Sequence, residues 1–195
     1  MSTSEKELFK LLGKFESEQK MPPIENWHPT IESEIDIKID SQGRWFHEGG
    51  YFERQDLARL FASILITENG QYFLITPSEK IKIVVEDVPF SIVLMDVKTP
   101  LGQQEISFIT SLGDEITASK TNPIEFRQFA GGWVPYVEVR NGLWGRVVQS
   151  VYYELMNLVK EREVSAGIDE PGTSDKNECY YLESAGEIFE VPASQ

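Results

Sequence analysis

The stretch QYFLITPSEKIKIVVEDVPFSIVLMDV, residues 71–97, decides the fold class. It holds three short runs rich in β-branched and aromatic residues, which is the composition of strands rather than of helices. Further runs of the same kind follow toward the carboxyl end. Together they predict about seven short strands, at 72–75, 80–85, 90–97, 105–111, 115–118, 124–129 and 134–139.

Beyond the last of these strands, apolar residues recur with helical spacing. Leu143, Val147, Val151 and Leu155 fall on one face, so the pattern predicts one long amphipathic helix over 143–160. Seven strands closed by a single helix is the element order of a pleckstrin-homology-like barrel.

Toward the amino end, the sequence predicts a helix, a hairpin and a second helix. A capping-box pattern precedes an apolar stripe over 5–18, and alternating residues at 35–40 lead through a turn to 45–48. The second helix follows the stripe that starts at Leu57, and Asn69-Gly70 is predicted to end it as a left-handed cap.

The two halves of the chain share an order of elements. Each half ends as a strand, an Arg-x-x-Leu motif (54–57 and 140–143) and a helix, with a tryptophan upstream. We therefore expect an α+β protein of two small parts with a duplicated strand-plus-helix core. The expected domains are 1–78 and 79–195, and the second one carries an acidic tail from about 161.

The charge of the chain limits its partners. Eighteen Lys and Arg against 32 Asp and Glu give a formal net charge of −14, which disfavours binding to duplex nucleic acid and to anionic membranes. No apolar run approaches the roughly 20 residues that a spanning helix requires. With a single cysteine, Cys179, and no secretory leader, the chain is expected to be cytoplasmic.

The sequence contains no motif that indicates catalysis, a metal or a cofactor. His47-Glu48 begins like a zinc-protease motif, but Tyr51 stands where the second histidine would be. Two histidines and one cysteine are too few for a dedicated transition-metal site. We therefore expect no catalytic residue, no metal ligand and no cofactor.

The placement of the few cations is more informative. Asn141 is predicted to cap the last helix, with Arg140 just before its start and Arg146 one turn inside it. A helix amino terminus flanked by arginines binds anions, although both arginines could instead pair with surface carboxylates. Arg54 is predicted to lie on the apolar stripe of its helix, so it needs a partner such as Glu48 or Glu86.

Five blocks of the chain resemble an uncharacterised bacterial family, the domain of unknown function 1285. The blocks are DSQGRWFHEG at 40–49, FxRxxL at 52–57, YFLITPxEK at 72–80, VEDxPF at 85–90 and RxGL at 140–143. The resemblance implies a duplicated two-part α+β protein whose carboxy-terminal part is similar to pleckstrin-homology folds. It also implies a nucleotide-like ligand between the parts and a role in signal transduction.

On this resemblance, six residues become candidates to line the ligand site, in addition to Asn141 and Arg146 at the predicted helix start. They are His47, Arg54, Lys80, Glu86, Asp87 and Arg140.

Three functions remain open at this stage. The first is a binding module that holds a small anionic, nucleotide-like ligand without catalysis. The second is a protein-interaction adaptor, for which the acidic tail would favour a basic partner. The third is a hydrolase that uses His47 with Glu48 or Glu86.

Overall fold

The chain divides into two compact units. A computed structural model describes residues 22–163 and 178–193. Unit 1 comprises Met1–Pro89 with Asn141–Leu143, and unit 2 comprises Phe90–Arg140 with Trp144–Gln195. Both units are built mainly from β-sheets, and the described residues contain two α-helices. The helix predicted at 5–18 lies outside the described residues.

Unit 1 is a six-stranded sheet with one helix. Its strands are β1 (Ile31–Ile39), β2 (Trp45–His47), β3 (Gly50–Tyr51), β4 (Leu65–Glu68), β5 (Gln71–Ile75) and β6 (Glu79–Val85). They lie in the order β3-β2-β1-β6-β5-β4, and β1 and β6 run parallel. A 3-10 turn, η1 (Ile24–Asn26), precedes the sheet, and α2 (Gln55–Ala62) connects β3 to β4.

The core of unit 1 forms where α2 packs on one face of its sheet. Ile37 and Ile39, at alternate positions of β1, are fully buried on that face, as is Phe61 of α2. The rings of Trp45 and Phe52 lie 6.2 Å apart, and those of Phe52 and Phe61 lie 5.5 Å apart. Burial of these large apolar groups is the main stabilising contribution here.

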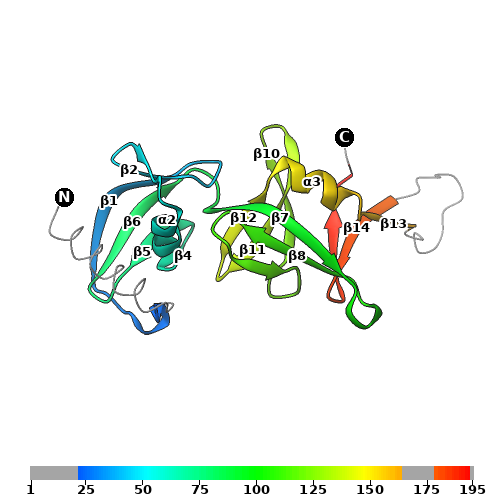
Figure 1. The fold of residues 1–195 in the computed structure, drawn as a ribbon, viewed down its shortest axis with the longest axis horizontal. Helices are drawn as coiled ribbons and strands as arrows, with labels where there is room; N and C mark the ends of the chain where they lie inside the picture. The colour runs from blue at the N-terminus through cyan, green and yellow to red at the C-terminus, as the bar shows by residue number, and fades with distance from the viewer. Residues whose placement is uncertain (1–21, 164–177, 194–195) are drawn as a thin grey trace, which may run out of the picture. The chain divides into compact units, whose positions relative to one another are not determined.

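Unit 2 repeats the strand order of unit 1 (Figure 1). Its elements are β7 (Phe90–Lys98), η2 (Pro100–Gly102), β8 (Glu105–Thr110), β9 (Glu115–Thr117), β10 (Ile124–Phe129), β11 (Gly132–Arg140), β12 (Leu143–Val147) and α3 (Gln149–Met156). The sheet order is β10-β11-β12-β7-β8-β9, with β7 and β12 parallel. In both units the first and last strands form the central pair, and the other strands extend outward from them.

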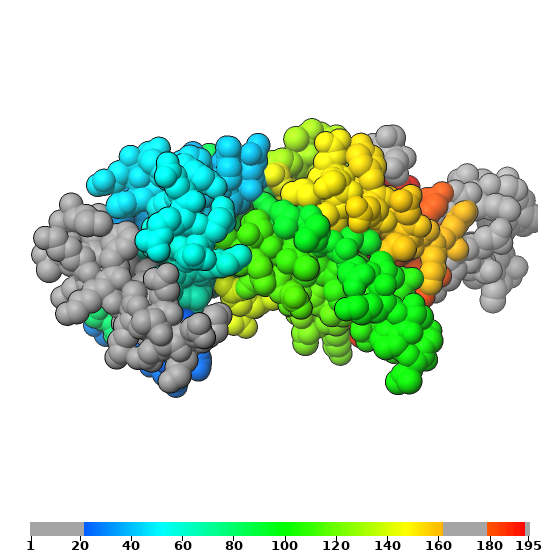
Figure 2. Space-filling model, viewed as in Figure 1, coloured from blue at the N-terminus to red at the C-terminus, as the bar shows by residue number. Residues whose placement is uncertain are grey.

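The duplication thus lies in the strands and not in the helices. In unit 1 the helix connects the third strand to the fourth, whereas α3 follows the sixth strand of unit 2. α3 packs against β7, and the space-filling view shows this yellow part of the chain beside the green surface (Figure 2).

A three-stranded sheet completes unit 2. Its strands are β13 (Lys160–Glu163), β14 (Glu178–Ser184) and β15 (Glu187–Val191). The fully buried Ser184 hydroxyl accepts a 2.8 Å bond from the Ile106 backbone N–H and donates a 2.8 Å bond to the Ala118 carbonyl. β14 and β15 pair as a hairpin through the turn at 184–186, within the segment expected to be an acidic tail, and this hairpin is hydrogen-bonded to β8.

Two predicted helix boundaries are wrong, for the same reason. Asn141 (φ 46°) and Gly142 (φ 77°) form the tight turn between β11 and β12, so 143–147 is a strand and α3 begins only at Gln149. Asn69 (φ 51°) and Gly70 (φ 74°) form the same kind of turn between β4 and β5, and α2 has already ended at Ala62. Two consecutive left-handed residues match the twist of a hairpin, which is why Asn-Gly favours one.

The predicted division between 78 and 79 falls just before β6. That strand pairs with β1 and β5, so it is part of the sheet of unit 1. Among the residues that the structure describes, no helix has the length and apolar character needed to cross a membrane.

Candidate functional site

A concavity of about 530 Å³ opens on unit 1, where the turn 40–44 meets β1 and β2. Lys38 and Phe46 line it and lie opposite each other on neighbouring strands. Tyr51 lies opposite Phe46 on the other side, and Val84 lies opposite Lys38. These four residues form a row across four strands: Lys38 and Phe46 line the pocket, and Tyr51 (47% exposed) and Val84 (58% exposed) continue the row outside its lining. The row supplies an apolar surface with one cation in it.

Asp40 organises the turn that bounds this pocket. Its carboxylate accepts the backbone N–H groups of Gln42 and Arg44, both at 2.9 Å, and the Nε of Arg44 at 2.7 Å. Partial burial favours the neutral form, but the bonds from Arg44 and Gln42 outweigh it and lower the pKa of Asp40 below its ordinary value. Asp40 and Arg44 are therefore engaged with each other.

A second ion pair joins Lys38 to Glu86 across the pocket. The other oxygen of Glu86 accepts the Ser41 backbone N–H at 2.8 Å. The hydrogen-bonded pair raises the pKa of Lys38 and lowers the pKa of Glu86. The side chains are 45% and 38% exposed, and an ion pair in such a position contributes little stability. Lys38 can therefore exchange Glu86 for another anion at small cost.

Asp36 lines the same pocket from β1. It lies two positions from Lys38, and both are exposed while Ile37 between them is buried, so the two charged side chains share one face. Within 22–163 and 178–193 the Asp36 carboxylate has neither an ion pair nor a hydrogen-bond partner. It differs in this from the carboxylates of Asp40 and Glu86.

Of the eight residues that the sequence analysis nominated, only Glu86 lines this pocket. His47 follows Phe46 on β2 and therefore points to the opposite face, where its ring lies 6.5 Å from that of Phe52. Asp87 is half-buried next to Glu86. Arg54 precedes α2 and is exposed, so its expected place on the apolar stripe is wrong.

Lys80 has a cross-strand role in the sheet of unit 1. Its ammonium lies 2.6 Å from Glu68 and 3.1 Å from Glu32, and 4.3 Å from the centre of the Phe73 ring. It thus joins side chains of β1, β4 and β5, and these contacts account for its position.

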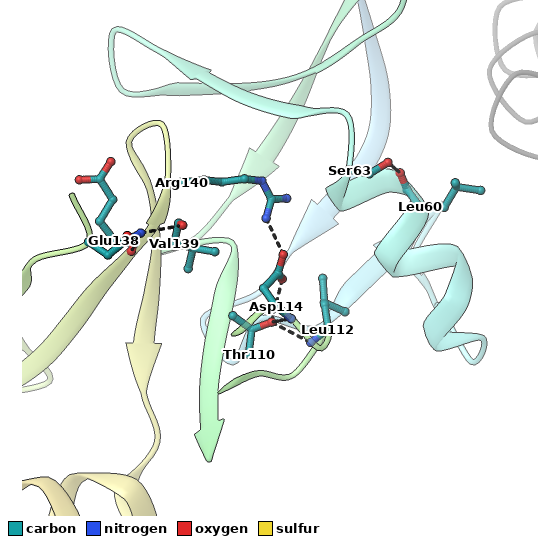
Figure 3. A network of polar contacts seen from close by, with 9 residues as sticks. Leu60, Ser63, Thr110, Leu112, Asp114, Glu138, Val139 and Arg140 are labelled. Carbon is teal, nitrogen blue, oxygen red and sulfur yellow. Dashed lines mark hydrogen bonds and ion pairs between the residues drawn. The ribbon is translucent and has the colours of Figure 1, made fainter. Parts of the chain in front are cut away.

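The three candidates from the end of β11 and from β12 do not form an anion site at a helix start. Arg140 bonds Asp114 at 2.7 Å, and Asp114 in turn accepts the Thr110 hydroxyl at 2.8 Å (Figure 3). The Arg140 guanidinium also lies 5.0 Å from the Phe90 ring centre. Asn141 is in the hairpin turn described above. The guanidinium of Arg146 lies 4.0 Å from the Phe129 ring centre, on a strand that precedes α3. The expected helix amino terminus at Asn141 is therefore wrong.

The sequence analysis missed the pocket residues Asp36, Lys38, Asp40 and Arg44. Their signal was present, because the first three alternate along a strand and are followed by a Gly-containing turn. That pattern also describes an ordinary solvated strand face. Only the folded structure shows that the turn 40–44 and Glu86 lie beside these side chains and form a pocket with them.

Two family models match consecutive parts of the chain. Residues 22–88 match the N-terminal domain, and residues 89–191 the C-terminal domain, of a family of unknown function, DUF1285. The chain belongs to the DUF1285 family. The resemblance seen in the five sequence blocks is thus confirmed, and the family carries no assigned activity.

Solved structures of DUF1285 proteins are similar to the chain. One from Silicibacter pomeroyi DSS-3 is 33% identical with a TM-score of 0.75, over 89% of this chain and 88% of that one. One from Shewanella baltica OS155 is 30% identical with a TM-score of 0.50, over 62% of this chain and 90% of that one. No curated protein matches the chain.

Proposed function

We propose that this DUF1285 protein is a regulatory binding module that holds a small anionic, nucleotide-like molecule in the pocket of unit 1. The observation that carries the proposal is the row Tyr51, Phe46, Lys38 and Val84, which places a cation within an apolar, partly aromatic surface. A planar ring can lie on the apolar part while a phosphate reaches Lys38.

The size of the pocket supports a ligand of this class. Its volume of about 530 Å³ lies within the range of small-molecule sites and exceeds what a single inorganic ion needs. Phe46 lines the pocket and forms a T-shaped pair with Tyr51 beside it, with centroids 5.7 Å apart, and the Arg44 guanidinium lies 5.8 Å from the Phe46 ring centre, so a ring that stacks here meets both an aromatic side chain and a second cation. Aromatic side chains accept all nucleobases in this way because every base has a π-face.

Lys38 can exchange its carboxylate partner for the phosphate of a ligand. When a phosphate arrives, Lys38 leaves Glu86, and Glu86 keeps its bond from the Ser41 N–H. Because the Lys38–Glu86 pair is exposed and screened by solvent, breaking it costs little, and a phosphate, which carries more negative charge than a carboxylate, can replace Glu86.

Calorimetric titration of the full chain with AMP, GMP, CMP and UMP tests the proposal. We expect at least one of them to bind, and Lys38→Met to weaken that binding about tenfold or more by removing the charge but not the apolar stem. Lys98→Met is the matched control, because Lys98 also pairs with a nearby carboxylate, Asp96, at 3.4 Å but lies in unit 2. Absence of binding by all four, or equal losses in the two variants, would refute the proposal.

Several finer expectations remain predictions. They are a ligand shared by both domains, the likeness of the carboxy-terminal part to pleckstrin-homology folds, a role in signal transduction, a cytoplasmic location, and the alternative roles of adaptor or hydrolase. A six-stranded sheet with α3 packed along β7 supports the pleckstrin-homology likeness, and superposition on such folds checks it.

A further inference from the structure

We propose that the ligand of the unit 1 pocket carries a vicinal diol, as an intact ribose does, and that the Asp36 carboxylate binds this diol. The inference rests on the proposed function and goes further, because it assigns a specificity residue and separates ribonucleotides from deoxynucleotides. It follows from the hydrogen-bonding state of the three carboxylates that line the pocket.

Two of these carboxylates already have donors. Asp40 accepts bonds from Gln42 and from both the backbone and the side chain of Arg44, and Glu86 accepts Ser41 and pairs with Lys38. Asp36 alone has no side-chain partner among the described residues. An ionised carboxylate only accepts hydrogen bonds, so the pocket presents two unused acceptor oxygens at this point.

A pair of neighbouring hydroxyl groups matches those two oxygens. Each hydroxyl donates one proton, and both can reach a single carboxylate together. The same chemistry operates in dinucleotide-binding folds, where an acidic side chain accepts the ribose hydroxyl. A phosphate cannot take this place, because it would meet the negative charge of Asp36 without a donor.

The backbone holds Asp36 at the right spacing from Lys38. Residues two apart on a strand lie about 6.6 Å apart along it, so one small molecule can touch both side chains. The pairing of β1 with β6 is irregular here, since Glu34 pairs with Lys82 and Lys38 with Val84. Such bulges re-aim side chains next to binding sites. The Glu48 N–H also fixes this segment by donating to the Asp36 carbonyl at 3.0 Å.

The experiment compares each ribonucleoside monophosphate that binds with its 2′-deoxy counterpart, by titration calorimetry on the full chain. For the wild type we expect the deoxy form to bind about tenfold more weakly or worse, the effect of losing one bond to a charged group. In Asp36→Ala the ratio of the two dissociation constants, deoxy form over ribo form, should fall to about one. Glu34→Ala is the matched control, because Glu34 is exposed on the same strand but does not line the pocket.

The change in affinity of each form for Asp36→Ala distinguishes a hydrogen bond to the diol from a simple effect of the Asp36 charge. Removing Asp36 takes away a negative charge near the phosphate, so the deoxy form should bind Asp36→Ala as well as or better than the wild type. The ribo form should bind the variant more weakly. A variant that binds both forms more tightly would show that Asp36 acts only through its charge.

The remaining outcomes are also decisive. A wild-type ratio near one, or a high ratio that survives in Asp36→Ala, overturns the assignment while leaving the proposed function standing. Absence of binding by every monophosphate overturns the proposed function, and the diol assignment with it.

Discussion

Gly145 of β12 offers a direct test of how the central strands of unit 2 pack. It lies opposite Phe90 in the parallel pair of β12 and β7. A Cβ atom at this position would lie 2.7 Å from Cδ1 and 3.2 Å from Cγ1 of Ile92, and 3.3 Å from Cβ of Phe90. Ile92 is fully buried and Phe90 is 1% exposed, so neither has free space to move into.

The expected effect of Gly145→Ala follows from two opposing contributions. Overpacking a core lowers the free energy of unfolding by about 1–3 kcal/mol. Replacing glycine reduces the conformational freedom of the unfolded chain, which raises the free energy of unfolding by about 0.4–1 kcal/mol. We expect a net destabilisation of about 1–2 kcal/mol, which for a unit of this size lowers Tm by about 5–10 °C.

Thermal and urea unfolding followed by tryptophan fluorescence measures this, because Trp144 adjoins the mutated position. Gly132→Ala is the matched control, since a Cβ on Gly132, at the start of β11, meets nothing within 4 Å. That variant should equal or slightly exceed the wild type in stability. If Gly145→Ala is as stable as Gly132→Ala, the described pairing of β12 with β7 is incorrect.

Two further predictions concern polar contacts. Arg140→Ala should destabilise unit 2 by about 1 kcal/mol, because it removes the ion pair to Asp114 and the contact with Phe90. A double-mutant cycle with Asp114→Asn should give a coupling energy of about 0.5 kcal/mol or more. Additive effects would contradict this. Because the folded-state pKa of Asp40 is lowered, the stability it contributes is present above its ordinary value of 3.8 and is lost as pH falls through the lowered value. Urea unfolding should therefore find Asp40→Asn less stable than the wild type at pH 7, with the gap closing below pH 4; a constant gap would show that Asp40 does not titrate as described.

The strands of the central stretch were predictable because each is short, β-rich and bounded by turn residues, whereas β4 was predicted as the end of a helix. The segments predicted at 72–75, 80–85 and 90–97 correspond to β5, β6 and β7. The segment 143–147 was not predictable as a strand, because Leu143 and Val147 fit both a helix and a strand. Residues four apart share one face of a helix, and residues an even number apart share one face of a strand. Gly145, unfavourable in a helix and buried in this sheet, was the residue that distinguished them.

The site was less predictable than the fold. Arg140 and Arg146 were predicted to bind an anion because they are cations near a predicted helix start. In the structure each lies against an aromatic ring of its own sheet. Lys38 and Asp36 looked like any solvated strand face. Their pocket depends on Glu86, far along the chain, and sequence spacing does not report such a contact.

The shared strand order has a consequence for synthesis of the chain. Because the first and last strands of each unit are central neighbours, neither sheet can close until its last strand has left the ribosome. Until β6 emerges, β1 and β5 each expose an unpaired edge to other nascent chains. Before β6 pairs with β1, the negative charges of Glu32, Glu34 and Asp36 on β1 disfavour pairing of its exposed edge with a strand of another chain.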